Sequence, residues 1–388
     1  MGYSESDLKH DEETLKNLEL FRSPSGFRRA MPKLISSVRK GPGKRYWVTM
    51  QYIAGGYQQM SRKLSSAGGL EEEENQTLKL VVATYKMAES IYQSWLESGG
   101  DTLNFPQLKY AMSRTTVLRH WGDALNALGL KESAEEIYEI GVSEKLWTKI
   151  MCRPEKQLET IEAGGSYFYE VEEVLPDFVV EGIKESLEGI RTEFMKNVKE
   201  GKGVETWKVE SSGLHSTHTW FQLPFYVDGD SKPGACGRYP LVCEVYDGER
   251  FPAARKGQIK LSAMAGGTVV RKHAGPTMER LRMHCSVVGE VGDDSWIRVG
   301  DEKRSWEVGE CFIFDESCEH EVFIGGVGGD EKYRVVLIAD LANPLLVNYE
   351  DYREASKGSK LAEVGGSRLY EETQDRFMRK RGHDVPEL

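Results

Sequence analysis

Residues 258–288 read QIKLSAMAGGTVVRKHAGPTMERLRMHCSVV, and this stretch decides the fold class of the C-terminal half. Seven short runs rich in apolar and β-branched residues begin here, separated by Gly, Asp or Pro clusters. Many short strands with turn signals and no helical interruption favour a sandwich or a jelly-roll barrel. The seven runs are residues 258–264, 268–271, 284–288, 296–299, 311–314, 321–324 and 333–341.

The N-terminal part of the chain has a helical pattern instead. Between residues 78 and 95, apolar residues recur every three or four positions, and residues 117–141 repeat this pattern in two units. Ala134 and Tyr138 stand where a tetratricopeptide repeat has its small and aromatic packing residues. We therefore predict a tetratricopeptide-like region, with an ordinary helical hairpin as the alternative.

The length of 388 residues exceeds that of one typical core, so more than one domain is expected. The predicted fold class is α+β and multidomain: a helical region followed by a double-stranded β-helix, the cupin-like jelly-roll barrel. A further amphipathic helix is predicted at 177–197, after a Pro-Asp start. We expect a helical region at 1–145, a barrel domain at 146–348 with its core at about 255–345, and a charged tail at 349–388.

Composition limits the kinds of partner that we expect this protein to bind. The formal net charge of −11 argues against non-specific binding to nucleic acid or to anionic membranes. No apolar run approaches the roughly 18 residues that span a bilayer, and the first residues contain no signal-peptide core. We therefore predict a cytoplasmic protein without a membrane span.

The six cysteines do not suggest a disulfide framework, and no CxxC pair occurs. Cys236 and Cys243 flank a loop that is short enough to be bridged. Two reduced thiols are the alternative interpretation of this pair.

Two histidines are the strongest candidates for chemistry. His273 lies at the end of an early predicted strand and His320 at the start of a late one. Jelly-roll barrels bring such positions together at their open mouth, where two imidazoles can bind divalent iron. A single histidine in a strand is more often a structural residue. The usual non-haem iron triad has a carboxylate where this chain has Gly275, which leaves that metal position open to a halide or water.

Three arginines lie in or beside the predicted strands: Arg280, Arg282 and Arg334. Burying a guanidinium without a partner is costly. A dicarboxylate co-substrate would satisfy such a group through a bidentate pair. The alternative is a solvated strand face on which these arginines pair with the many acidic residues.

Between about residues 145 and 346, a series of motifs occurs in a recognisable order. The motifs are Leu146-Trp147 with Arg153-Pro154, residues 213–225, Ala235-Cys236 with Cys243, residues 257–262, 273–284, 297–300, 306–309 and 314–322, and Arg334 with Asp340 and Asn343-Pro344. In these motifs the chain resembles the aspartyl/asparaginyl β-hydroxylases, which are Fe(II)- and 2-oxoglutarate-dependent oxygenases. The helical region upstream also resembles that of this family.

The resemblance implies a role for each metal and co-substrate residue. His273 and His320 would be the Fe(II) ligands, and the family itself has a glycine where Gly275 stands. Four residues would hold 2-oxoglutarate, with Arg334 on its distal carboxylate. These four are Ser262, Arg282, His284 and Arg334.

The resemblance also implies a substrate pocket. Arg280 would pair with a substrate carboxylate, Lys260 would lie near that pocket, and His215 would replace a second arginine of the animal enzymes. Cys236 and Cys243 match a pair that is disulfide-bonded in lumenal members.

The predicted function is therefore an Fe(II)- and 2-oxoglutarate-dependent dioxygenase, which uses dioxygen to hydroxylate an Asp/Asn-type residue or a related carboxylate-bearing substrate. That substrate is a peptide, a protein or a small molecule. A non-catalytic scaffold is the alternative from another class, with a vestigial barrel and a protein partner bound to the helical region. An iron halogenase is a further alternative, because the position at Gly275 is open.

Overall fold

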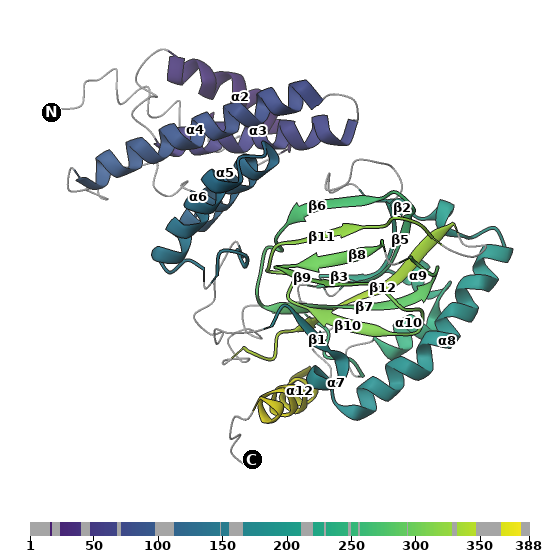
Figure 1. The fold of residues 1–388 in the computed structure, drawn as a ribbon. Coiled ribbons are helices and arrows are strands. Elements are labelled where there is room, and N and C mark those ends of the chain that lie inside the picture. The colour runs from purple at the N-terminus through teal and green to yellow at the C-terminus, as the bar shows by residue number, and fades with distance from the viewer. Residues whose placement is uncertain are drawn as a thin grey trace. The chain divides into compact units, whose positions relative to one another are not determined.

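The computed structural model describes residues 16–17, 24–39, 47–67, 71–97, 112–147, 149–154, 166–210, 220–228, 230–246, 250–254, 257–292, 294–327, 332–346 and 366–381. The chain divides into two compact units, Met1–Ile150 and Met151–Leu388. The described part of the first unit is helical, and the second is built on antiparallel sheets (Figure 1). Helices followed by antiparallel strands are the arrangement that the sequence pattern predicted.

The first unit contains five described helices. The α3 and α4 helices pack along each other, and α5 and α6 form a hairpin. The bounds are α2 (Pro24–Arg39), α3 (Trp47–Ala67), α4 (Glu71–Glu97), α5 (Arg114–Ala127) and α6 (Lys131–Ser143).

The α5–α6 hairpin is closed by a glycine and an aromatic side chain. Gly129 has a φ of +76°, the left-handed conformation that glycine adopts without a steric penalty. A Cβ atom at Gly122 would lie 2.1 Å from the Tyr138 ring, so the ring packs where only a glycine fits. Tyr138 and Ala134 are both buried, as packing residues should be. The tetratricopeptide assignment of this hairpin stays a prediction.

The second unit contains twelve described strands. Their bounds are β1 (Phe168–Glu170), β2 (Lys208–Val209), β3 (Trp220–Val227), β4 (Asp230–Ser231), β5 (Gln258–Ala265), β6 (Val269–His273), β7 (Arg280–Val288), β8 (Trp296–Val299), β9 (Glu302–Arg304), β10 (Cys311–Phe314), β11 (His320–Phe323) and β12 (Tyr333–Ala342). The larger sheet has the order β1-β10-β7-β12-β5-β3-β2, with β4 against β3, and the smaller has the order β6-β11-β8-β9. From β5 to β12, the chain alternates between the two sheets, apart from the β8–β9 hairpin.

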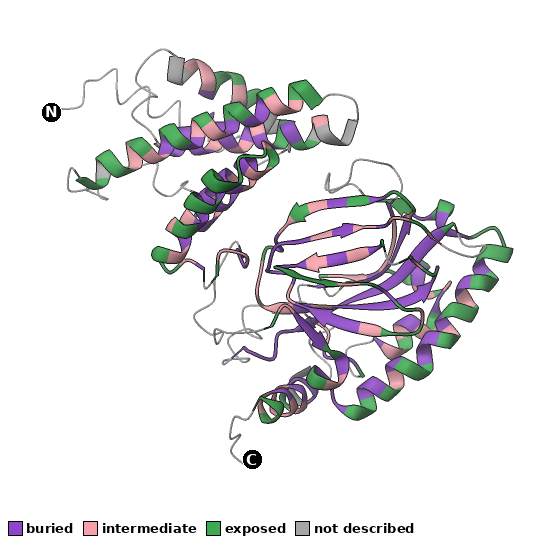
Figure 2. Ribbon diagram, in the orientation of Figure 1, coloured by how far each residue is buried: buried purple, intermediate pink, exposed green. Residues whose placement is uncertain are grey.

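One face of the larger sheet is covered by helix α8 (Asp177–Lys199), whose buried side faces the strands (Figure 2). This helix was predicted at 177–197, and its apolar residues Val179, Ile183 and Phe194 are buried in the same core as β5, β7 and β12. The shorter helical segments of this unit are α7 (Val171–Val174), η4 (Val204–Thr206), α9 (Pro233–Cys236) and α10 (Pro240–Val245).

The predicted charged tail contains a helix, α12 (Gly366–Lys380). Leu369, Tyr370 and Phe377 are buried, and the Tyr370 hydroxyl donates to the carbonyl oxygen of Leu346 at 2.8 Å. This helix is therefore packed against the second unit rather than surrounded by solvent.

All six cysteines are paired, so the expectation that they do not make a disulfide framework is wrong. The disulfides are Cys152–Cys318, Cys236–Cys243 and Cys285–Cys311. Two of them join strand neighbours that are 166 and 26 residues apart, a proximity that spacing along the chain does not reveal. Paired cysteines are typical of oxidising compartments, which argues against the predicted cytoplasmic location.

Among the described residues, no helix has both the length and the apolar character that a membrane span needs.

Candidate functional site

The alternation of side chains along three central strands creates the site. Successive residues of a strand point to opposite faces of the sheet. Odd-numbered apolar residues of β5, β7 and β12 join the core with α8, whereas even-numbered residues of the same strands line a cavity between the two sheets. These even-numbered residues are Gln258, Lys260, Ser262 and Met264 of β5, Arg282 and His284 of β7, and Arg334 and Ile338 of β12.

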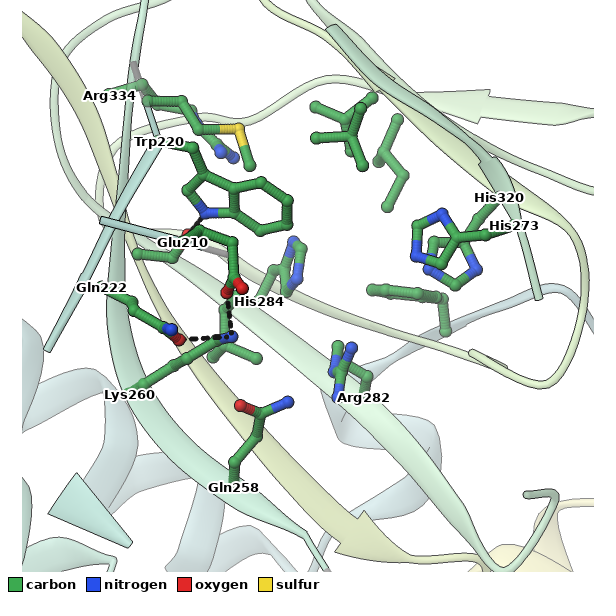
Figure 3. A pocket seen from close by; sticks show the side chains of 17 residues that line it. Glu210, Trp220, Gln222, Gln258, Lys260, His273, Arg282, His284, His320 and Arg334 are labelled. Atoms are coloured by element: carbon green, nitrogen blue, oxygen red, sulfur yellow. Dashed lines mark hydrogen bonds and ion pairs between the residues drawn. The ribbon is translucent and has the colours of Figure 1, made fainter. Parts of the chain in front are cut away.

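The cavity has a volume of about 320 Å³ (Figure 3). The smaller sheet closes it with His273 of β6, Ile297 of β8 and His320 of β11. In Figure 3, the two histidine rings lie together on one side, across the cavity from Lys260. The cavity therefore has a histidine side and a lysine side.

His273 and His320 form one cross-strand pair, because β11 and β6 place them opposite each other. Their ring centroids are 4.1 Å apart. The Nδ1 atom of His273 lies 2.8 Å from the carbonyl oxygen of Arg271, and that of His320 lies 2.9 Å from the carbonyl oxygen of Cys318. A carbonyl oxygen only accepts, so each Nδ1 carries the proton and each Nε2 carries the lone pair.

Both histidines thus have the tautomer of a metal ligand whose second nitrogen is held by the backbone. Burial, followed by the neighbouring His273, keeps the pKa of His320 well below its usual value, so this ring is neutral. Neutral imidazole suits divalent iron and other first-row metals. In the described part of the chain, no group of three or more His, Cys, Asp or Glu residues could hold a metal. His273 and His320 are a pair of described imidazoles that face one cavity.

Gly275 cannot carry the missing carboxylate. Its backbone nitrogen donates to the carbonyl oxygen of Glu316 at 2.6 Å, and a Cβ atom on Gly275 would lie 2.6 Å from the same oxygen. Real Cβ atoms do not approach a backbone atom so closely. The backbone therefore closes this position to any side chain, which leaves coordination positions for exogenous ligands.

Arg334 is a buried guanidinium that faces the cavity. It is 1% exposed, and its Nε and Nη1 atoms have no hydrogen-bond partner among the described residues. Its guanidinium carbon lies 4.2 Å from the centroid of the Trp306 ring. Burial lowers the pKa of Arg334 to about 9. A carboxylate from a ligand would supply the missing partner in the geometry that arginine favours.

Two hydrogen-bond donors also face the cavity. The Nε1–H group of Trp220 donates to the Ser262 oxygen at 2.9 Å, so the Ser262 O–H group remains a donor. The Nε1–H group of Trp306 donates to Nδ1 of His284 at 3.4 Å, which places the His284 proton on Nε2. Burial, followed by the charge of Arg334, keeps the pKa of His284 well below its usual value. Ser262, neutral His284 and Arg334 together suit the oxygens of a carboxylate.

Arg282 and Arg280 have different surroundings, because both are ion-paired. Arg282 binds Asp340 through Nε and Nη2 at 2.7 and 3.0 Å, and its Nη1 lies 2.6 Å from Glu316. Arg280 contacts Glu316, and its Nε lies 3.5 Å from Asp340. We call these four residues the arginine–carboxylate cluster. Arg282 lines the cavity, but Arg280 is not among the lining residues.

The lysine side of the cavity contains Gln222 and Glu210, two polar residues that were not predicted from the sequence. Nζ of Lys260 lies 3.7 Å from Glu210 and donates to the Gln222 amide oxygen at 3.2 Å. Burial lowers the pKa of Lys260. Alternation along β3 could have indicated Gln222, because it is two residues after Trp220, which also lines the cavity. The predicted substrate residue His215 lies outside the described residues.

Comparison with known proteins finds similarity over the part of the chain that contains the cavity. Residues 184–344, which include all the cavity residues, match the family model described as aspartyl/asparaginyl beta-hydroxylase. The human aspartyl/asparaginyl beta-hydroxylase is 31% identical over 230 residues, which cover 58% of this chain and 29% of that protein. This chain therefore spans less than a third of the human protein.

Two further relatives match a shorter segment. The mouse aspartate beta-hydroxylase domain-containing protein 2 is 31% identical over 140 residues, 36% of this chain and 39% of that protein. The ornithine lipid ester-linked acyl 2-hydroxylase of Rhizobium tropici is 38% identical over 128 residues, 33% of this chain and 42% of that protein. The names of these relatives share hydroxylation but differ in what is hydroxylated.

Proposed function

We propose that this chain, which belongs to the aspartyl/asparaginyl beta-hydroxylase family through residues 184–344, is an Fe(II)- and 2-oxoglutarate-dependent dioxygenase. The proposed reaction hydroxylates an Asp/Asn-type residue or a related carboxylate-bearing substrate. The alternation of β5 to β12 between two sheets supports a double-stranded β-helix as the fold of this domain.

The buried guanidinium of Arg334 is the observation that carries this proposal. A positive charge without a hydrogen-bond partner for Nε or Nη1 among the described residues is costly inside a protein. It lies in the same cavity as His273 and His320, whose backbone-held tautomers suit a metal. A metal side and a carboxylate side in one cavity are what a dioxygenase with an oxo-acid co-substrate requires.

The residues of the cavity would have separate roles in binding the metal, binding the co-substrate and excluding water. Nε2 of His273 and of His320 would hold Fe(II). Ser262, Arg282, His284 and Arg334 would hold 2-oxoglutarate, with Arg334 on its distal carboxylate. When bound, Fe(II) supplies the redox chemistry that couples dioxygen and 2-oxoglutarate to C–H hydroxylation, with release of succinate and carbon dioxide. The protein positions the reactants and keeps water out with the apolar side chains of the cavity wall. These include Val270, Ile297, Val322 and Ile338.

The lysine side of the cavity is the proposed place of the substrate. The buried Lys260 lies there beside the partly exposed Gln222 and Glu210, so both charged and amide groups are available to a polar substrate. Arg280 is held by Glu316 and Asp340, and a substrate carboxylate would have to share it with them. The relatives include a lipid acyl hydroxylase as well as an aspartyl/asparaginyl hydroxylase. Both a peptide and a small-molecule substrate therefore fit the proposal.

Anaerobic titration with Fe(II) and 2-oxoglutarate tests the proposal. We expect a weak visible charge-transfer band in the wild-type protein, and succinate after air is admitted. His320→Ala should abolish both, whereas His120→Gln, which changes a histidine of the helical unit, should retain them. No band and no succinate from folded wild-type protein would contradict the proposal. A chloride-dependent product mass would instead favour the halogenase.

A further inference from the structure

A short segment after the helical unit crosses the loop that leads into His320. The Sγ atoms of Cys152 and Cys318 are bonded, and the two residues also form a β-bridge. The backbone nitrogen of Glu319 donates to the carbonyl oxygen of Met151 at 2.6 Å. The backbone nitrogen of Arg153 donates to the carbonyl oxygen of Ser317 at 3.0 Å. The loop is therefore held to this segment covalently and through its backbone.

A buried ion pair adds to these contacts. Nη2 of Arg153 lies 2.7 Å from Oε2 of Glu319, and the two side chains are 1% and 6% exposed. Nη2 of Arg298 lies 3.0 Å from the other carboxylate oxygen of Glu319. The Glu319 carboxylate therefore lies between two guanidinium groups, one on each of its oxygens. We call the Cys152–Cys318 disulfide and the Arg153–Glu319 ion pair the loop clamp.

The loop clamp ends at the group that orients His320. The carbonyl oxygen of Cys318 accepts the hydrogen bond from Nδ1 of His320, so the backbone of a clamped residue sets the ring direction. The pairing of β11 with β6 shifts register between His320 and Val322. The pairing of β11 with β8 stays in register through His320, so on the β6 side, which carries His273, the loop adds a constraint that the strand ladder does not supply.

We infer that the loop clamp is a positioning device, which aims Nε2 of His320 at the metal and makes the two-histidine site bind tightly. The inference rests on the proposed function, because it assumes a metal between His273 and His320. Groups that hold a metal ligand through its second nitrogen typically change metal affinity by 10 to 100-fold when they are removed. This matters more where only two protein side chains bind the ion.

The chain supplies its own control, because another disulfide lies outside the lining of the cavity. Cys236–Cys243 joins α9 and α10, and neither cysteine lines the cavity. Removing either disulfide takes a crosslink out of the unfolded chain. The conformational entropy of the unfolded chain then rises, and the stability of the folded protein falls. Only the loss of the loop clamp should change the direction of His320.

The test compares Co(II) binding by the full chain and its variants, with Co(II) absorption and a competing chelator as readouts. Circular dichroism establishes a temperature at which every variant is folded. We expect Cys152→Ala/Cys318→Ala to bind Co(II) at least about ten-fold more weakly than wild type. Cys236→Ala/Cys243→Ala should stay within two-fold of wild type, even where its thermal midpoint falls comparably. Glu319→Gln keeps the disulfide and should weaken binding in the same direction.

Each of the other outcomes contradicts either the positioning role of the loop clamp or the proposed function. Clamp variants that bind Co(II) within two-fold of wild type, with an unchanged spectrum, would overturn the positioning role. If Cys152→Ala/Cys318→Ala fails to fold, Glu319→Gln alone decides, and unchanged affinity there overturns the inference. Wild-type protein that binds no Co(II) would overturn the proposed function instead, together with the inference that rests on it.

Discussion

Arg282 and Arg334 lie on the neighbouring strands β7 and β12, and both point into the space between the sheets, yet their surroundings differ. Burial alone would lower the pKa of Arg282, but Asp340 and Glu316 hold it above the usual value. For Arg334, burial acts without such an opposing carboxylate, and the pKa falls to about 9. The protein itself neutralises the charge of Arg282, whereas Arg334 has no carboxylate partner among the described residues.

The difference lies in how the charge of each guanidinium is compensated within the fold. Within the arginine–carboxylate cluster, two guanidinium groups meet two carboxylates and the charges balance. No described carboxylate is paired with Arg334, and Trp306 provides only the face of its ring. A folded protein accepts that cost where function requires it. Substitution of either arginine tests this contrast.

The largest expected effect is on stability and comes from the cluster. Arg282→Met would leave Asp340 and Glu316 buried with only Arg280 between them. Removing one partner of a buried ion pair costs about 3–5 kcal/mol of unfolding free energy. Urea unfolding would measure this loss, and the exposed Arg191→Met on α8 should stay within about 0.5 kcal/mol of wild type. A loss of under about 1 kcal/mol would mean that the cluster does not need Arg282.

The next effect is on ligand affinity and comes from Arg334. Arg334→Met removes a buried charge that has no described carboxylate partner, so the stability of the ligand-free protein should hold or rise. Affinity for 2-oxoglutarate should fall by about 2–5 kcal/mol, because the carboxylate loses its partner. Calorimetric titration of 2-oxoglutarate into Co(II)-loaded protein measures this. A dissociation constant within three-fold of wild type would place the co-substrate elsewhere.

The smallest expected effect appears on raising the pH. The pKa of Arg334 is lowered to about 9, so its guanidinium is charged at neutral pH and loses its proton at a lower pH than in the unfolded chain. Between that value and its ordinary pKa, the unfolded chain binds more protons, so this residue's contribution to stability rises with pH.

Ligand binding should respond in the opposite direction. Affinity for 2-oxoglutarate should decline above pH about 9, by up to ten-fold per pH unit, because the carboxylate needs the charged guanidinium. Titrations of wild type between pH 7 and 10 would show this decline, and Arg334→Met should lack it. A flat wild-type profile would mean that a bound carboxylate or another group keeps Arg334 charged throughout.

The sequence predicted where the two candidate histidines stand in their strands. His273 ends β6 and His320 begins β11, as the alternation of short strands indicated. It did not predict the arginine–carboxylate cluster, because Asp340 is 58 residues from Arg282 and becomes its partner only through the pairing of β12 with β7. Residue type identified the arginines, but only the register between strands identified their partners.

Some strands were missed for local reasons. The β3 strand contains Pro224, a residue that argues against a strand, and the pairing with β5 shifts register directly after it. The β1 strand has only three residues, too few for a periodic pattern. Both strands depend on tertiary pairing, with β5 and β10, rather than on their own sequence.

The position of β12 has a consequence for how the chain comes to be folded. It is the last of the described strands, yet it lies between β5 and β7 in the larger sheet. A ribosome adds about 5–20 residues per second, so β5 and β7 wait several seconds with open edges before β12 emerges. Open strand edges are templates for aggregation. A nascent chain that ends before Tyr333 already contains both histidines, but it lacks Arg334 and the strand that closes the sheet. We therefore expect the nascent chain to depend on chaperones until β12 has emerged.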